Sequence, residues 1–219
     1  MSDVGQIERK TQNRVVKLFA EQLGYEYGGN WEYRQGTSNI EEALLTQNLK
    51  ARGYSELMVS RAIDQLKKAA AVSVGHDLYE ANREVYELLR YGVKVKPSVS
   101  DPTVTVWLID WSDPNANHFV VAEEVTVLGQ HTKRPDVVLY VNGIAFATIE
   151  LKRSYVGVSE GIRQTLGNQD KQFIRPFFST VQLVFAGNDV EGLRYGVIAT
   201  PEKYWLEWKE PSEIADPLD

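Results

Sequence analysis

The sequence contains no cysteine. This absence excludes disulfide scaffolds, zinc–thiolate sites, iron–sulfur clusters and cysteine nucleophiles. A chain without thiols suits a reducing compartment, and we expect a cytoplasmic location. The sequence also lacks an apolar run near the roughly 18 residues that a membrane helix requires, and its first residues show no signal-peptide pattern. We therefore expect no membrane partner.

The chain has no positive net charge either: its 24 Lys and Arg residues and 30 Asp and Glu residues give a net charge of −6. Averaged over the chain, this charge argues against a nucleic-acid partner. The charges are unevenly distributed, however. Residues 130–175 hold seven basic and four acidic residues, a net charge of +3, so the remainder carries −9. That segment is the part of the chain whose charge suits a phosphate backbone.

The spacing of apolar residues divides the chain in two. Residues 3–92 show helical spacing, whereas from residue 93 the pattern changes to the alternation typical of strands. We expect a single α/β (α+β) domain with a mixed central sheet flanked by helices. In this division residues 1–92 form a mostly helical part that contributes its first helix to the core. Residues 93–208 form the core itself, and residues 209–219 begin a linker.

Charged side chains end one otherwise apolar strand, in the sequence I-E-L-K at residues 149–152. Glu150 and Lys152 are two residues apart, so on a strand they project from one face. Asp136 opens the preceding strand, and Asn142-Gly143 between the strands is a strong hairpin signal. The hairpin brings two carboxylates together, which repel unless a cation lies between them, and Mg²⁺ prefers such oxygen ligands. With a nearby ammonium group, these are the parts needed for metal-assisted phosphodiester hydrolysis.

The register of this hairpin decides whether the two carboxylates meet. A two-residue turn with regular pairing places Asp136 opposite Ile149 and therefore on the face away from Glu150. A three-residue turn, or an equivalent bulge, places Asp136 on the Glu150 face. The metal hypothesis thus predicts one of these two devices. On residue chemistry alone, an ordinary solvated Glu-x-Lys pair on an exposed strand stays open as the alternative.

The sequence around these residues resembles a known motif. R-P-D at 134–136 followed by I-E-L-K at 149–152 resembles the PD-(D/E)xK nuclease motif. In detail it is similar to the N-terminal endonuclease domain of the R subunit of Type I restriction-modification enzymes. The resemblance covers about residues 117–208 and, more loosely, the first helix. Its other pieces are N-H-F at 117–119, G-I-R-Q at 161–164, I-R-P at 174–176, F-A-G-N at 185–188 and Y-G-V-I-A-T-P at 195–201.

The resemblance implies specific roles for the three motif residues. Asp136 and Glu150 would hold a divalent metal, Mg²⁺ with Mn²⁺ as a substitute, and Lys152 would be the catalytic lysine. The family's next helix often carries Q-x-x-x-Y, which Gln164 matches as an active-site or DNA-positioning residue. Asn168 stands where that pattern has tyrosine, which leaves the tyrosine's role without a counterpart.

A further metal-directed residue is suggested on the first helix. Glu8 matches a helical glutamate that related nucleases direct toward the metal. The alternative is an ordinary exposed acid of an amphipathic helix.

The function implied by the resemblance is that of a Mg²⁺-dependent endonuclease domain that cleaves double-stranded DNA. Methylation and specificity subunits would be its partners, and ATP would serve only motor domains that these 219 residues lack. Two alternatives are a catalytically silent nuclease-fold domain that docks DNA or partner subunits, and another nuclease of repair or resolvase type. The intact D…E-x-K pattern argues against the silent domain.

Overall fold

The computed structural model describes residues 3–98 and 100–209, with side chains from Arg9 onward. The helical segments are α1 (Asp3–Lys17), its π-helical continuation η1 (Leu18–Gln22), α2 (Glu42–Ala51), α3 (Glu56–Ala70), α4 (Leu78–Tyr91), η2 (Pro114–Ala116), α5 (Val158–Asn168), η3 (Arg175–Ser179) and η4 (Glu202–Tyr204). The strands are β1 (Glu26–Asn30), β2 (Val93–Val95), β3 (Val104–Val106), β4 (Phe119–Glu123), β5 (Val137–Val141), β6 (Ile144–Leu151), β7 (Leu183–Asn188), β8 (Gly192–Gly196) and β9 (Leu206–Glu207).

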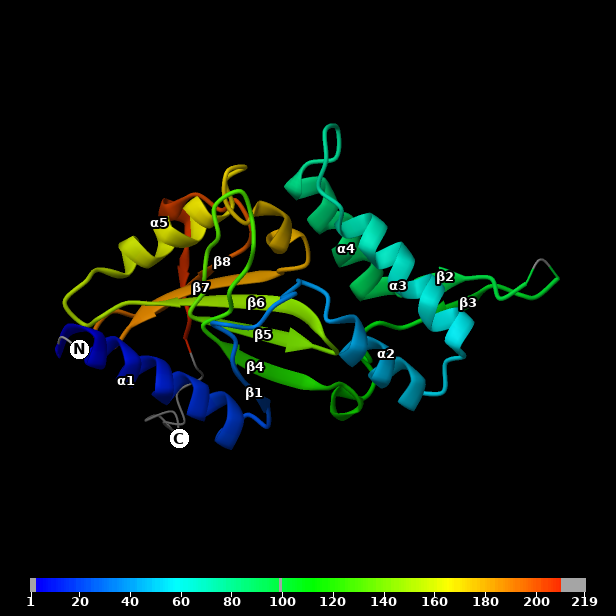
Figure 1. Cartoon of the computed structure of the whole chain (residues 1–219), viewed down its shortest axis with the longest axis horizontal. Helices are drawn as coiled ribbons and strands as arrows, with labels where there is room; N and C mark the ends of the chain where they lie inside the picture. Colours follow the sequence, from blue (N-terminus) through cyan, green and yellow to red (C-terminus); the bar gives the residue numbers. More distant parts are fainter. Residues whose placement is uncertain (1–2, 99, 210–219) are drawn as a thin grey trace, which may run out of the picture.

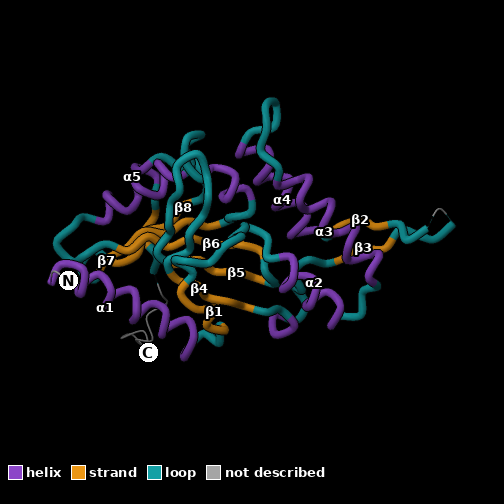
Figure 2. The backbone as a smooth tube through the Cα atoms, viewed as in Figure 1, coloured by secondary structure: helices purple, strands orange, loops and turns teal. Residues whose placement is uncertain are grey.

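The described residues form one seven-stranded mixed sheet in the order β1-β4-β5-β6-β7-β8-β9 (Figures 1 and 2). The pairs β1–β4 and β6–β7 are parallel and the other neighbours are antiparallel. Helix α5 makes the crossover that the parallel β6–β7 pair requires. The prediction of a mixed sheet flanked by helices is confirmed.

Helices cover the two faces of the sheet unequally (Figure 1). On one face, α5 and η3 close the largest core, in which Tyr140, Ile162 and Phe178 are buried. On the other face α1 packs through Val16 over a smaller core that includes Leu139. The face on which α5 packs is therefore covered by α5 and η3, whereas the opposite face is covered by α1 alone among the regular α-helices described.

Helices α2, α3 and α4 and the β2–β3 hairpin lie to one side of the sheet (Figure 1). They share a separate apolar core, which reaches the sheet through Val141 and Ile144. β2 and β3 pair with each other in a two-stranded sheet, apart from the central one. None of the helices among the described residues is long and apolar enough to cross a membrane.

The β5–β6 hairpin combines a two-residue turn with a bulge. Asn142 and Gly143 have φ values of 53° and 82°, as a primed turn requires, and Val141 pairs with Ile144. The register then shifts, so that Tyr140 pairs with Ala145 but Leu139 with Ala147, and Phe146 is the extra residue. Beyond the bulge Val137 pairs with Ile149, which brings Asp136 level with Glu150. The prediction of a three-residue turn or an equivalent bulge is confirmed by the bulge.

Gly143 is required by both its conformation and its surroundings. A Cβ at this position would lie 2.6 Å from the carbonyl oxygen of Glu41 and 2.8 Å from Leu44 Cβ. Gly143→Ala is therefore expected to lower the free energy of unfolding by about 3 kcal/mol, as measured by urea denaturation. Gly75→Ala is the matched control, because Gly75 has φ +84° but nothing within 4 Å of its Cβ position. Equal losses in the two variants would contradict the assigned clash.

Some elements differ from the expected pattern. The edge strand β1 lies inside the part expected to be mostly helical, and its sequence E-Y-G-G-N carries no alternation of apolar residues. Helix α4 begins at Leu78, where Asp77 and Glu80 form a capping box. The division at residues 92 and 93 stays a prediction, and the linker expected after residue 209 lies almost wholly outside the described residues.

Candidate active site

Asp136, Glu150 and Lys152 meet where β5 begins and β6 ends. The backbone N–H of Leu151 donates to Asp136 Oδ2 at 2.7 Å, which anchors that carboxylate across the two strands. Lys152 Nζ donates to Glu150 Oε1 at 2.9 Å. The three motif residues predicted from the sequence are therefore brought together by the bulged register.

Helix α5 packs directly over the lysine. A Cβ at Gly161 would lie 3.2 Å from Ala186 Cβ and 3.4 Å from Lys152 Cγ. The glycine thus lets the helix approach the sheet closely, and the aliphatic part of Lys152 is enclosed, with 13% of its side chain exposed. An enclosed stem holds the ammonium group in one place.

Glu150 is a strongly perturbed acid of the site. Its side chain is 3% exposed, and burial, with the nearby Asp136 carboxylate as the second cause, raises its pKa to about 8. The Lys152 ammonium opposes this rise without cancelling it. Two carboxylates in this arrangement hold negative charge that one ammonium group compensates incompletely.

The site opens into a pocket of about 450 Å³. Its lining combines the three motif residues with hydroxyl, amide and basic side chains: Thr126, Thr132, Lys133, Arg134 and Gln164. Such groups donate hydrogen bonds to phosphate oxygens. Lys133 makes a cation–π contact, because its Nζ lies 4.1 Å from the centroid of the Phe173 ring.

The other residues predicted for the site differ in their placement. Gln164 is exposed on α5 at the pocket rim and has no hydrogen-bond partner among the described residues. Asn168, in place of the family tyrosine, is 3% exposed and does not line the pocket. The side chain of Glu8 lies outside the described part of the chain, so its metal-directed role stays a prediction. The next residue of α1, Arg9, bonds Glu123 at 2.9 Å, which puts this turn of the helix beside the end of β4.

A buried polar network behind the site was not anticipated from the sequence. Glu123 is 4% exposed and accepts hydrogen bonds from Arg9 at 2.9 Å, Tyr27 Oη at 2.7 Å and Gln12 Nε2 at 3.2 Å. Gln12 also donates to the backbone oxygen of Asp136, at 3.4 Å. Burial and the bond to Glu123 raise the pKa of Tyr27 to about 12. The network therefore fastens α1 and β1 to the strand end from which Asp136 projects.

Glu123→Ala is expected to lower the free energy of unfolding by about 3 kcal/mol, because three donors lose a buried acceptor. Urea denaturation measures the loss. The matched control is Glu207→Ala, which removes a 3.4 Å ion pair to Arg194 from a side chain that is 48% exposed, and it is expected to change stability by less than about 0.5 kcal/mol. Similar small losses in both variants would show that the network does not fasten α1.

The donor set fits a small divalent cation. Asp136 and Glu150 supply carboxylate oxygens from neighbouring strands, and burial together with the Asp136 carboxylate raises the pKa of Glu150. No cluster of three or more acidic or histidine side chains suited to a metal occurs in the described part of the chain. Two carboxylates in an open pocket suit Mg²⁺, which usually keeps several waters and takes one or two protein carboxylates.

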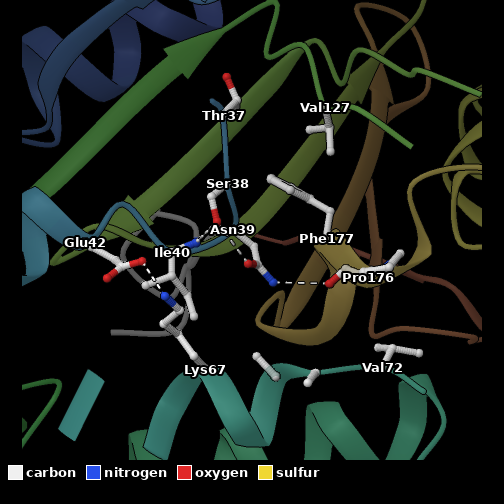
Figure 3. A pocket seen from close by; sticks show the side chains of 12 residues that line it. Thr37, Ser38, Asn39, Ile40, Glu42, Lys67, Val72, Val127, Pro176 and Phe177 are labelled. Atoms are coloured by element: carbon white, nitrogen blue, oxygen red, sulfur yellow. Dashed lines mark hydrogen bonds and ion pairs between the residues drawn. The ribbon is translucent and has the colours of Figure 1, made fainter. Parts of the chain in front are cut away.

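Another pocket, of about 420 Å³, lies at the junction of the helical part and the sheet (Figure 3). Asn39 Nδ2 donates to the Pro176 oxygen at 3.2 Å, and Lys67 Nζ donates to Glu42 Oε1 at 2.7 Å (Figure 3). Glu42 is the one carboxylate among its lining residues, and it is already paired. This pocket lies between the two parts of the fold. Unlike the pocket lined by Asp136 and Glu150, it contains no pair of acids.

Comparison with known proteins agrees with the geometry. A family profile described as "Type I restriction enzyme R protein N terminus" matches residues 5–203. The chain is 26% identical over 161 residues to the Type I restriction enzyme HindI endonuclease subunit of Haemophilus influenzae. That match covers 69% of this chain and 15% of the subunit, so the chain corresponds to a small part of its relative's length. Since the profile spans most of the sequence, the chain belongs to the family of N-terminal regions of Type I restriction enzyme R proteins.

Proposed function

We propose that this domain hydrolyses phosphodiester bonds of double-stranded DNA as the endonuclease part of a Type I restriction enzyme. The observation that carries the proposal is the bulged hairpin, which sets Asp136 level with Glu150 while Lys152 lies 2.9 Å from Glu150. Family membership supports the same activity. An intact set of two acids and a lysine is not expected in a domain that only docks partners.

In this proposal Asp136 and Glu150 hold Mg²⁺, with Mn²⁺ as a substitute. When bound, the cation supplies charge stabilisation at the scissile phosphate and lowers the pKa of a coordinated water. The Leu151 N–H keeps the Asp136 carboxylate in place while the ion is held. Glu150 would be the second ligand of the ion, and a bound cation would favour the ionised form that burial and, second, the Asp136 carboxylate disfavour.

Lys152 then acts at the phosphate. Its enclosed stem keeps the ammonium group in the pocket, where it donates to a phosphate oxygen as negative charge develops. Lys133 and the hydroxyl group of Thr132 line the path of the DNA backbone, and Gln164 donates from the rim. These groups position the phosphate without reading sequence.

Sequence recognition is proposed to come from elsewhere in the enzyme. The pocket presents phosphate-binding groups, and the chain's net charge of −6 disfavours independent binding of DNA. Specificity and methylation subunits would deliver the substrate, and ATP would serve motor domains outside these 219 residues. The same observation makes weak activity of the isolated domain an expected result.

The test uses the complete R subunit assembled with its partner subunits and circular double-stranded DNA. The intact enzyme is expected to cut both strands, whereas Asp136→Asn is expected to keep ATP hydrolysis and lose cutting. An intact enzyme that binds the DNA and hydrolyses ATP but never cuts would favour the silent docking domain. Cutting that persists in Asp136→Asn would show that the nuclease site lies elsewhere.

A further inference from the structure

The sheet face that α1 crosses is incompletely covered. An apolar groove of about 520 Å³ runs between α1, η1 and the exposed parts of β5 to β8. Its floor is formed by side chains such as Phe146, Leu183 and Phe185, and its wall by Leu18 and Leu23. Helix η1 contributes no fully buried residue: Phe19 and Ala20 pack only partly buried against the core beneath, and Leu18 is exposed.

Large apolar side chains are exposed on the groove walls. Leu18 is 42% exposed, Leu23 54% and Trp208 44%. Leu18 and Trp208 both line the same hollow although they are 190 positions apart in the chain. Leu18, Leu23 and Trp208 therefore surround one site.

The chain leaves the described fold at the edge of this groove. Trp208 packs edge-on against Phe185 and Tyr195, with ring centroids 5.7 and 5.5 Å apart, and its backbone N–H donates to the Leu193 oxygen at 2.8 Å. Residue 208 is thereby fixed against the sheet. Residues 210–219 begin two positions later, so this segment starts beside the groove.

The sequence of this segment complements the groove in apolar content, and it complements in charge the exposed face of α1 beside the groove. E-P-S-E-I-A-D-P-L-D carries four acids, no base, and the apolar residues Ile214 and Leu218. Lys10, Arg14 and Lys17 share one exposed face of α1, and Arg14 lines the groove. Lys10 and Lys17 have no ion pair among the described residues, and Arg14 has one, to Asp189.

We propose that residues 210–219 dock in this groove, with Ile214 and Leu218 on the apolar floor and the acids along the basic face of α1. The segment is long enough, because six residues of extended chain span about 20 Å from Trp208 to Ile214. Docking covers the sheet face opposite α5 and does not depend on the nuclease proposal. A second copy of the chain, or another domain, would be a different occupant of the same groove.

The absence of cysteine allows a direct test on the 219-residue chain. Leu18→Cys with Ile214→Cys introduces a single thiol pair, and oxidation is followed by mobility on a non-reducing gel. Asn13→Cys with Ile214→Cys is the matched control, because Asn13 is also exposed on α1 but does not line the groove. Docking is expected to make the intramolecular disulfide of the first pair form about tenfold faster than that of the control, through a higher effective concentration.

Two further comparisons keep the outcome decisive. Replacing Lys10, Arg14 and Lys17 by glutamate is expected to remove most of the difference between the pairs. In chains that retain Leu18, a lone cysteine at 214 should react with a thiol reagent several times more slowly than a lone cysteine at 212. Equal oxidation rates for the two pairs, equal labelling at 214 and 212, or disulfides formed only between chains would each overturn the proposal.

Discussion

Lys152→Ala is expected to reduce DNA cleavage by the assembled enzyme by about three orders of magnitude while the domain stays folded. The substitution removes a cation whose ammonium group bonds Glu150 and lines the open pocket. Cleavage of circular DNA under single-turnover conditions measures the loss. Lys50→Ala is the control, because Lys50 pairs with Glu56 on the surface of the helical part, away from the pocket.

Metal binding separates the role of the lysine from that of the acids. Mn²⁺ titration of Lys152→Ala by calorimetry is expected to show affinity equal to or higher than that of the unaltered domain, because a cation competing for Glu150 is gone. Asp136→Asn is expected to weaken binding at least about tenfold. If Lys152→Ala cleaved at the normal rate, or if it lost metal binding as Asp136→Asn does, the assigned roles would be wrong.

Glu150→Gln is expected to abolish cleavage and, without metal, to raise the free energy of unfolding by about 2 kcal/mol at pH 8. The pKa of Glu150 is raised from its ordinary 4.5 to about 8 in the folded protein. Between these values the folded state binds more protons than the unfolded state, so stability falls as pH rises. The neutral amide avoids that loss.

The pH dependence supplies the control for this prediction. Urea denaturation with EDTA is expected to show a difference between Glu150→Gln and the unaltered domain that grows from pH 5 to pH 8. The exposed Glu207→Gln should show no such growth. A Glu150→Gln variant that is less stable at pH 8 than at pH 5, relative to the unaltered domain, would mean that the buried carboxylate is stabilising in the folded state. Its assignment as a strained metal ligand would then fail.

The local part of the site was predictable from the sequence. Asn142-Gly143 between two apolar strands specifies a hairpin, and the two-residue spacing of Glu150 and Lys152 specifies a shared face. The bulge at Phe146 was predictable only as a requirement of the metal hypothesis. No residue at that position signals it, and the neighbouring Ala145 N–H donates to the oxygen of Asn39, a residue far away in the sequence.

The surroundings of the site depend on contacts that sequence patterns do not record. Glu123 meets Arg9 and Gln12 across more than 100 positions, and Tyr27 reaches it from a strand whose sequence shows no alternation. Glu123 is an ordinary acid in the sequence, but in the fold it is buried at the end of β4 and holds α1 through its bonds to Arg9 and Gln12. Such a residue becomes recognisable only when the strands are placed beside the helix.

The pairing of Asp136 with Glu150 around a divalent ion is tested most directly by crystallography of the domain with Mn²⁺. The account predicts one anomalous peak between the two carboxylates in the unaltered domain and none in Asp136→Asn. It would be contradicted by saturating Mn²⁺ that leaves this position empty, or by an ion bound away from Glu150, in a protein whose assembled enzyme cuts DNA.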